Sequence, residues 1–125
     1  MTEKKGLPST DILVQSVIKG MLEKKAADIV VMDLRQTNNS VADYFIICTG
    51  NSDTQIDAIS SSIDDVVSRE CSENPWHIEG KSSKSWMLID YITVVAHIFK
   101  KEVRDFYGLE NLWGDAKIEL IPAEI

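Results

Sequence analysis

Apolar residues near the start of the chain recur three and four positions apart, which is the spacing of a helix with one buried side. Two such rows lie side by side: Leu13, Val17 and Met21, and Val14, Ile18 and Leu22. Ser9, Thr10 and Asp11 precede them, and each of these residue types can cap a helix. The pattern therefore predicts a first helix that begins within residues 9–11.

A second helix is predicted after Gly50 and Asn51, where Ser52 and Gln55 form a capping box. In that motif the serine side chain accepts a hydrogen bond from a backbone N–H, and the glutamine reaches back to the start of the helix. Five apolar residues then share one side of the helix: Ile56, Ile59, Ile63, Val66 and Val67. The segment ends before Pro75.

The other apolar segments have the composition and alternation of β-strands. Residues 41–49 are apolar on both faces, which predicts a central strand that is covered on both sides. The predicted strands are residues 28–34, 41–49, 76–79, 85–90 and 92–99, with a weak edge strand over 117–121. A short helix is predicted over residues 100–107, and Gly108 can close it.

This order of elements predicts an α/β fold, or α+β by a stricter convention, with a single mixed β-sheet and helices packed on it. We expect one domain over residues 9–121, preceded by a flexible leader over residues 1–8 and followed by a tail over residues 122–125. The sequence contains no internal repeat and no low-complexity run that would divide this domain.

The charge of the chain is acidic and unevenly distributed. The 125 residues include 20 acidic and 13 basic ones, which gives a formal net charge of -7. Residues 36–80 hold eight of the acidic residues and a single basic one. An acidic surface repels phosphate backbones, which disfavours DNA as a partner, whereas it attracts a basic protein. A merely solvated surface is the alternative interpretation of the same charge.

Several kinds of site and location are disfavoured by the sequence. The longest apolar run, from Tyr44 to Cys48, is too short to cross a membrane, and the polar start of the chain does not form a secretion signal. We therefore expect a cytoplasmic protein without membrane contact. Cys48 and Cys71 have no CxxC spacing, and His77 and His97 have no metal-binding spacing, so that neither a metal nor a cofactor is expected.

An enzyme would most plausibly use the turn at residues 50–52, where a strand leads into a helix and backbone N–H groups can bind an anion. Nucleotidyltransferases place a Gly-Ser turn here, and they need two carboxylates alternating on a following strand to hold magnesium. The next close acidic pair, Asp64 and Asp65, lies in the predicted second helix, where adjacent side chains point about 100° apart. Catalytic activity is therefore not expected.

The predicted strand at residues 85–90 has one face of mixed character. Because side chains alternate along a strand, Trp86, Leu88 and Asp90 point to one side, and the residues between them point with Tyr91 to the other. A face that combines a tryptophan with a carboxylate is neither uniformly apolar nor uniformly polar. The pattern alone favours a core and an interface position equally for Trp86.

Residues 42–52 read ADYFIICTGNS and closely resemble the ADYFVICTGNS signature of the ribosomal silencing factor family, also called the Iojap family. Further matching residues follow in the order of the family: Glu79-Gly80, Ser85-Trp86, Asp90-Tyr91, Val95, His97, Arg104, Tyr107, Leu109-Glu110 and Leu112-Trp113. The match extends from about Ile12 to Ala116. The chain departs from the family at Ile92, where glycine is usual, and in the tail beyond Ala116.

The resemblance implies a nucleotidyltransferase-like fold that lacks the catalytic carboxylates, and a role without catalysis or cofactor. Family members bind large-subunit ribosomal protein fourteen and sterically block association of the large and small ribosomal subunits. This lowers translation under nutrient limitation or in stationary phase. The alternative function is assembly of the large subunit through the same face, and a nucleotide-binding turn at residues 50–52 is a third, disfavoured hypothesis.

By resemblance, the contact surface for the ribosomal protein is expected at Trp86, Leu88 and Asp90, with Glu79 and Tyr91 as further contacts. His97 also matches the family, and we interpret it as a structural residue with a hydrogen bond inside the sheet. The sequence leaves open whether the free protein is a monomer or a homodimer, in which edge strands near the C-terminus would pair between two copies.

Overall fold

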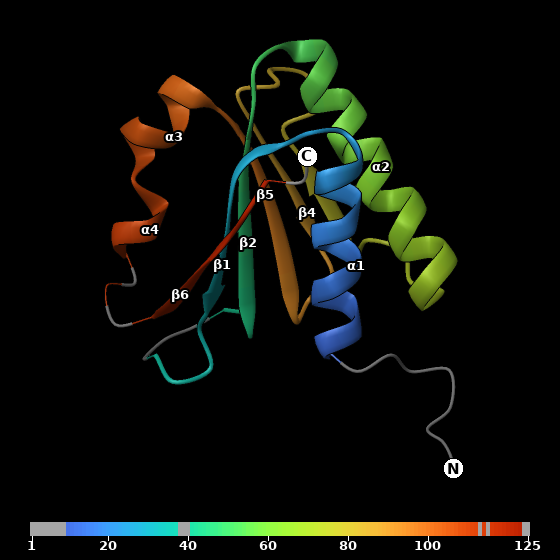
Figure 1. Cartoon of the computed structure of the whole chain (residues 1–125), viewed down its shortest axis with the longest axis vertical. Helices are drawn as coiled ribbons and strands as arrows, with labels where there is room; N and C mark the ends of the chain where they lie inside the picture. The colour runs from blue at the N-terminus through green and yellow to red at the C-terminus, as the bar shows by residue number, and fades with distance from the viewer. Residues whose placement is uncertain (1–9, 38–40, 113, 115, 124–125) are drawn as a thin grey trace.

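A mixed β-sheet of six strands lies between two pairs of helices in the computed structural model (Figure 1). The structure describes residues 10–37, 41–112, 114 and 116–123. The elements follow one another in this order: α1 (Thr10–Glu23), β1 (Ala27–Asp33), β2 (Tyr44–Gly50), α2 (Asp53–Cys71), β3 (His77–Glu79), β4 (Trp86–Asp90), β5 (Val94–Lys100), α3 (Lys101–Tyr107), α4 (Leu109–Leu112) and β6 (Lys117–Ile121). The predicted α/β class with a single mixed sheet is confirmed. The leader over residues 1–8 and Trp113 lie outside the described residues.

The strands are arranged across the sheet in the order β3-β4-β5-β2-β1-β6. β2 and β5 run parallel, and every other neighbouring pair is antiparallel. β2 lies between β5 and β1, and all seven of its residues are buried, as the two apolar faces of its sequence predicted. The predicted edge strand over residues 117–121 is β6. The helix α4 was not predicted, because a single turn of four residues is too short to show a helical repeat.

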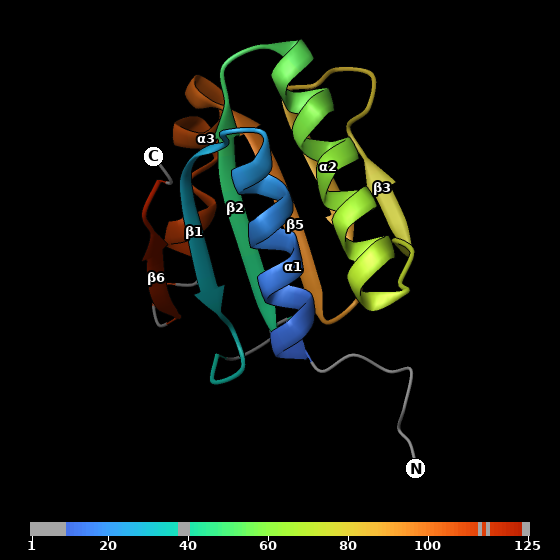
Figure 2. The same ribbon diagram turned by 45° about the vertical axis from the view of Figure 1, so that its right-hand side comes forward.

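The helices α1 and α2 lie side by side over one face of the sheet (Figure 2). Their apolar rows meet the strands in the larger of two cores, in which Val17, Met21 and Ile63 are completely buried. The two helices are so close at Gly20 that a Cβ atom there would lie 2.7 Å from the Cα atom of Ile63. This face of the sheet is therefore covered by the packed helices α1 and α2.

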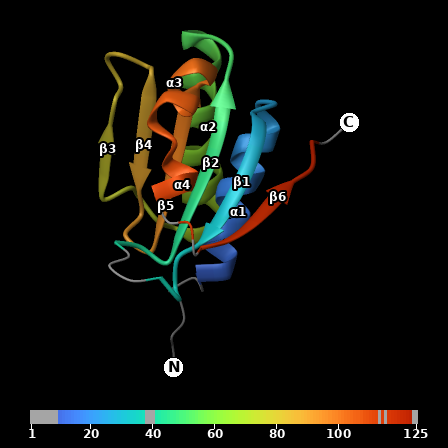
Figure 3. The same cartoon turned by 90° about the vertical axis from the view of Figure 1, so that its left-hand side faces the viewer.

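The opposite face is covered only in part, by the short helices α3 and α4. Figure 3 shows both helices in front of β5 and β2, whereas no helix lies in front of β3 and β4. A smaller core forms beneath the helices, where Phe45, Ile47 and Phe99 of the sheet are buried together with Leu109 of α4. The part of this face formed by β3 and β4 is thus left without a helical cover.

Arg104 attaches α3 to the sheet. This residue is only 8% exposed, and its Nη1 donates to the Asp28 carbonyl oxygen (2.7 Å) and to Thr49 Oγ1 (2.9 Å). Its Nη2 and Nε donate to Glu110 Oε2 at 2.8 Å and 3.3 Å. A buried cation is stable only where it is paired and hydrogen-bonded. These bonds connect α3 to β1, β2 and α4, and they determine where α3 lies on the sheet.

The turn between β4 and β5 contains a strained residue, Ile92, with φ of +74°. A β-branched side chain is disfavoured in the left-handed region, and the Ile92 side chain is exposed, so that its packing offsets little of that cost. We expect Ile92→Gly to raise the free energy of unfolding by about 1 kcal/mol, measured by urea denaturation. Thr93→Gly is the matched control, and it should lower the free energy because the φ of Thr93 is not positive. Equal destabilisation by both changes would contradict the assignment of strain to Ile92.

Candidate protein-interaction surface

The uncovered part of the second sheet face carries five side chains from β3 and β4. Register places His77 opposite Asp90 and Glu79 opposite Leu88, and directly paired residues project to the same side of a sheet. Trp86 is paired with Phe99 of the smaller core and projects to that side as well. We call this surface the open face: His77, Glu79, Trp86, Leu88 and Asp90. The structure therefore brings together four of the five predicted contact residues.

Trp86 belongs both to the core and to the open face. Its indole ring stacks on Phe99, with 4.9 Å between ring centroids, and lies 4.8 Å from the ring of Tyr107. Its Nε1–H donates to Nδ1 of His97 at 3.0 Å. Trp86 nevertheless remains partly exposed. These contacts fix the orientation of the indole ring, and the exposed part of the ring is available for contact with a partner.

His97 is the residue that orients this indole. Burial holds the pKa of His97 at about 3, so the imidazole is neutral at physiological pH. Because Nδ1 accepts the bond from Trp86, the proton of the neutral ring is assigned to Nε2, which is buried without a hydrogen-bond partner among the described residues. This geometry agrees with the interpretation of His97 as a structural residue. Its hydrogen bond lies inside the sheet, as predicted, and joins the side chains of β4 and β5.

Stability should fall as the pH is lowered through the ordinary pKa of histidine. The unfolded chain protonates His97 near pH 6.5, whereas the folded protein does so only near pH 3, so the unfolded state binds more protons between these values. The free energy of unfolding should drop by about 2 kcal/mol between pH 7.5 and pH 5, measured by urea denaturation at each pH. His97→Gln should remove most of this drop. An equally steep drop in the variant would contradict the assignment to His97.

The loop before β4 depends on Gly80, where φ is +89°. A Cβ atom at this position would lie 2.1 Å from the carbonyl oxygen of Trp86, so that only glycine fits.

Two carboxylates of the open face have contacts within the protein. At the edge of this face, Glu79 Oε2 and His77 Nε2 are 2.6 Å apart. Asp90 Oδ1 accepts a hydrogen bond from the Ile92 N–H at 2.7 Å. These contacts hold the carboxylates of Glu79 and Asp90 in place, and the two groups give the open face its acidic character.

Tyr91 does not belong to this surface, which corrects one of the predicted contact residues. It is only 4% exposed and lies in the larger core, on the side of α1 and α2. Burial also raises the pKa of its phenol above the ordinary value. Tyr91 was predicted as a contact because it belongs to the Asp90-Tyr91 pair that matches the family. Side chains alternate between the two faces of a sheet, however, so Asp90 and Tyr91 point to opposite sides.

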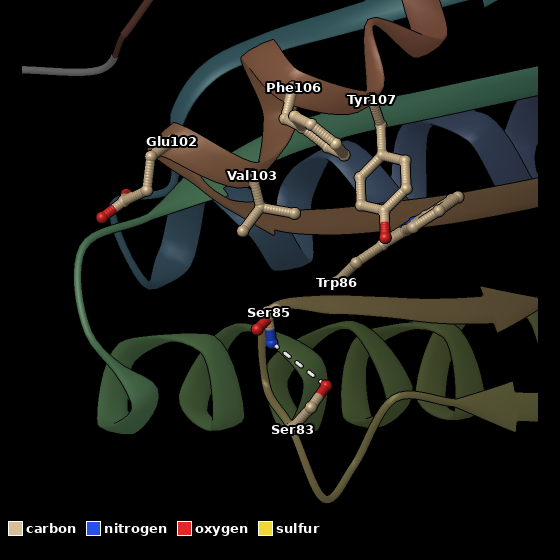
Figure 4. A pocket seen from close by; sticks show the side chains of 7 residues that line it. All are labelled: Ser83, Ser85, Trp86, Glu102, Val103, Phe106 and Tyr107. Atoms are coloured by element: carbon tan, nitrogen blue, oxygen red, sulfur yellow. Dashed lines mark hydrogen bonds between the residues drawn. The ribbon is translucent and has the colours of Figure 1, made fainter.

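Two aromatic residues that were not predicted as contacts extend the surface beyond Trp86. A groove of 550 Å³ lies between the start of β4 and α3, and Figure 4 shows the side chains around it. Phe106 is 82% exposed, and Tyr107 is half exposed between Phe106 and Trp86. Adjacent side chains on a helix point about 100° apart, but both can be buried, as Val66 and Val67 of α2 are, so that no signal in the sequence marked these two rings as exposed.

The turn at residues 50–52 uses its own side chains to satisfy its backbone. Ser52 Oγ accepts from the Gln55 N–H at 3.1 Å, as the predicted capping box requires, and Gln55 Oε1 accepts from the Asn51 N–H at 2.6 Å. The side-chain amide of Gln55 donates to the carbonyl oxygens of Lys24 and Lys25. Internal bonds therefore occupy donors that an anion would otherwise use.

The buried cysteine of β2 and the metal-ligating side chains are further candidates for chemistry among the described residues. Cys48 is completely buried, and burial raises its pKa to about 12, so that it is not a nucleophile at neutral pH. Within the described ranges, no three His, Cys, Asp or Glu side chains lie close enough together to hold a metal ion. The described helices include none with the length and apolar character needed to span a membrane.

Comparison with known proteins agrees with the resemblance seen in the sequence. The sequence profile of the family described as "Ribosomal silencing factor during starvation" matches residues 8–124. Ribosomal silencing factor RsfS of Bacillus subtilis is 42% identical over 99 residues, which cover 77% of this chain and 80% of that protein. The mouse protein named "Mitochondrial assembly of ribosomal large subunit protein 1" is 28% identical over 102 residues, or 80% of this chain and 44% of that protein.

The fold agrees with a solved structure as well. A crystal structure of a protein from Chromobacterium violaceum superposes with a TM-score of 0.80 and 28% identity, covering 93% of this chain and 95% of that one. The sequence profile spans nearly the whole chain, and the Bacillus subtilis relative exceeds 40% identity over most of it. The chain therefore belongs to the ribosomal silencing factor family.

Proposed function

We propose that this protein binds the large ribosomal subunit through ribosomal protein fourteen and sterically blocks its association with the small subunit. Translation is then repressed when nutrients are limiting, in the cytoplasm and without a catalytic step. The observation that carries the proposal is the open face, which presents a partly exposed tryptophan and leucine together with two carboxylates in a member of the ribosomal silencing factor family.

The composition of the open face fits a basic protein partner. Interfaces gain most of their binding free energy from a few central aromatic or apolar anchors, and Trp86 and Leu88 lie on β4, which runs between β3 and β5 in the sheet. Charged residues around such anchors mainly increase the rate and specificity of association. Glu79 and Asp90 provide two carboxylates at this position, and the net charge of -7 disfavours direct contact with ribosomal RNA.

Assembly of the large subunit is the second candidate function. The name of the mouse relative describes an assembly protein of the mitochondrial large subunit, and the aligned region covers 80% of this chain. An assembly factor would use the same open face but would bind precursors of the large subunit. A deletion strain that accumulates immature large subunits during growth in rich medium would favour assembly over silencing.

A change of charge on the open face tests the proposed partner. Glu79→Lys should weaken binding to purified ribosomal protein fourteen about tenfold, because it replaces an exposed carboxylate with a positive charge, which the basic partner repels. Glu119→Lys is the matched control, since it makes the same change on β6 at the opposite edge of the sheet. Both affinities can be measured by isothermal titration calorimetry. Equal effects of the two variants, or no effect of Glu79→Lys, would contradict the proposal.

We also propose that free copies associate weakly through β6. This strand forms the outer edge of the sheet beside β1, and its side chains Ile118 and Leu120 are exposed on the same side as the smaller core. An exposed apolar edge strand favours pairing with another strand. Sedimentation of the free protein over a range of concentrations should show a dimer that Leu120→Lys abolishes. A monomer at all concentrations would exclude this pairing.

A further inference from the structure

The groove beside the open face has an unusual combination of lining groups. Three aromatic rings and one aliphatic side chain meet two hydroxyl groups and one carboxylate: Trp86, Phe106, Tyr107, Val103, Ser83, Ser85 and Glu102 (Figure 4). Its volume of 550 Å³ is in the range of sites that bind small ligands or short segments of a partner. Lysine and arginine are absent from this lining.

Two of the lysines near the groove in sequence form ion pairs on the other side of the sheet, whereas Lys101, next to Glu102, is exposed on α3. Lys84 lies between two of the lining serines, and its Nζ is 3.4 Å from Asp57 Oδ1 of α2. Lys100 precedes α3, and its Nζ is 2.6 Å from Asp53 Oδ1 at the start of α2. Lys84 and Lys100 are therefore held toward α2, and Lys101 is not part of the groove lining, whereas Glu102 is.

An apolar occupant would not suit all of these groups. It could cover Phe106 and Val103, but it would remove water from Glu102 and from the serine hydroxyls without replacing their hydrogen bonds. A cation with a flat apolar surface suits both halves of the groove. A guanidinium can stack on aromatic rings and donate several hydrogen bonds to carboxylate and hydroxyl oxygens, whereas an ammonium is more strongly hydrated and has fewer donors.

We propose that this groove binds an arginine side chain of the basic protein partner. The aliphatic part of the side chain packs on Val103 and Phe106, and the guanidinium lies between the aromatic rings and Glu102. The inference rests on the proposed function, because the arginine belongs to ribosomal protein fourteen, and it adds a specific subsite to the open face. Arg104 supports the subsite indirectly, since its bonds to the sheet position α3.

The test is a double-mutant cycle between the full-length protein and purified ribosomal protein fourteen. Glu102→Gln should weaken binding about tenfold. Asp105→Asn, an exposed change on the same helix but outside the groove lining, should leave the affinity unchanged. Each arginine of the partner is then replaced in turn by lysine. One of these replacements should cost a similar factor with the wild-type chain and little more with Glu102→Gln.

A further variant distinguishes an arginine from an apolar occupant. Phe106→Leu keeps an apolar surface and removes the aromatic ring, so that it should weaken binding several-fold if a guanidinium stacks there. Wild-type affinity in Glu102→Gln or Phe106→Leu, or absence of coupling between Glu102 and any arginine, would overturn the inference while leaving the proposed function intact. If the wild-type chain does not bind ribosomal protein fourteen at all, the proposed function fails and the arginine subsite fails with it.

Discussion

Trp86→Ala should reduce the affinity of the protein for the large ribosomal subunit at least thirtyfold. Removal of a tryptophan at the centre of an interface typically costs about 2 kcal/mol or more, and a tenfold change corresponds to about 1.4 kcal/mol. Trp86 belongs to both the open face and the groove lining, and its orientation is fixed by His97 and Phe99 before any partner binds. Affinity can be measured by co-sedimentation with purified large subunits.

Two controls separate loss of contact from loss of folding. Trp86→Phe keeps an aromatic ring on Phe99 but removes the bond to His97 and part of the ring surface, so its loss of affinity should be smaller. Arg69→Ala removes an exposed side chain of α2, on the opposite face of the sheet, and should bind normally. A Trp86→Ala protein that unfolds cooperatively and binds as tightly as the wild type would show that the interface lies elsewhere.

Arg104→Ala should lower the free energy of unfolding by about 3 kcal/mol. Loss of one partner of a buried ion pair leaves the remaining groups unsatisfied, and such changes typically cost about 3–5 kcal/mol. The lower end applies because Glu110 is 29% exposed and can regain water. Thr49 and the Asp28 carbonyl would also lose their donors. The change can be measured by urea denaturation.

Arg69→Ala is the matched control for Arg104→Ala. Arg69 forms an exposed pair with Asp65 at 3.4 Å, one turn apart on α2, and such pairs contribute about 0.5 kcal/mol or less. Arg104→Lys keeps the charge but lacks the planar fork, so it should recover only part of the lost stability. A loss for Arg104→Ala no larger than that for Arg69→Ala would show that α3 is held mainly by other contacts.

Much of the fold could be predicted because local patterns agreed with the tertiary structure. Residues 41–49 are apolar on both faces, and the central strand β2 covers Tyr44–Gly50. Ser52 and Gln55 predicted the start of α2 because their capping bonds are local. The alternation of residues 86–90 correctly placed Trp86, Leu88 and Asp90 on one face.

The groove could not be predicted in the same way, because it depends on contacts between residues far apart in the sequence. Arg104 bonds to Asp28 and Thr49, which lie 76 and 55 positions away, and these bonds bring α3 beside β4. No local pattern specifies that placement. The resemblance correctly indicated the family but also included Tyr91 as a contact, because a motif does not state which side of a sheet each residue faces.

The most direct test of the proposed function is the association of purified large and small ribosomal subunits, followed by light scattering at increasing concentrations of this protein. The steric account predicts that saturating wild-type protein prevents the rise in scattering. Trp86→Ala should need at least thirtyfold more protein for the same inhibition, and Arg69→Ala should act like the wild type. Subunit joining that proceeds unchanged at saturating wild-type protein would contradict the account.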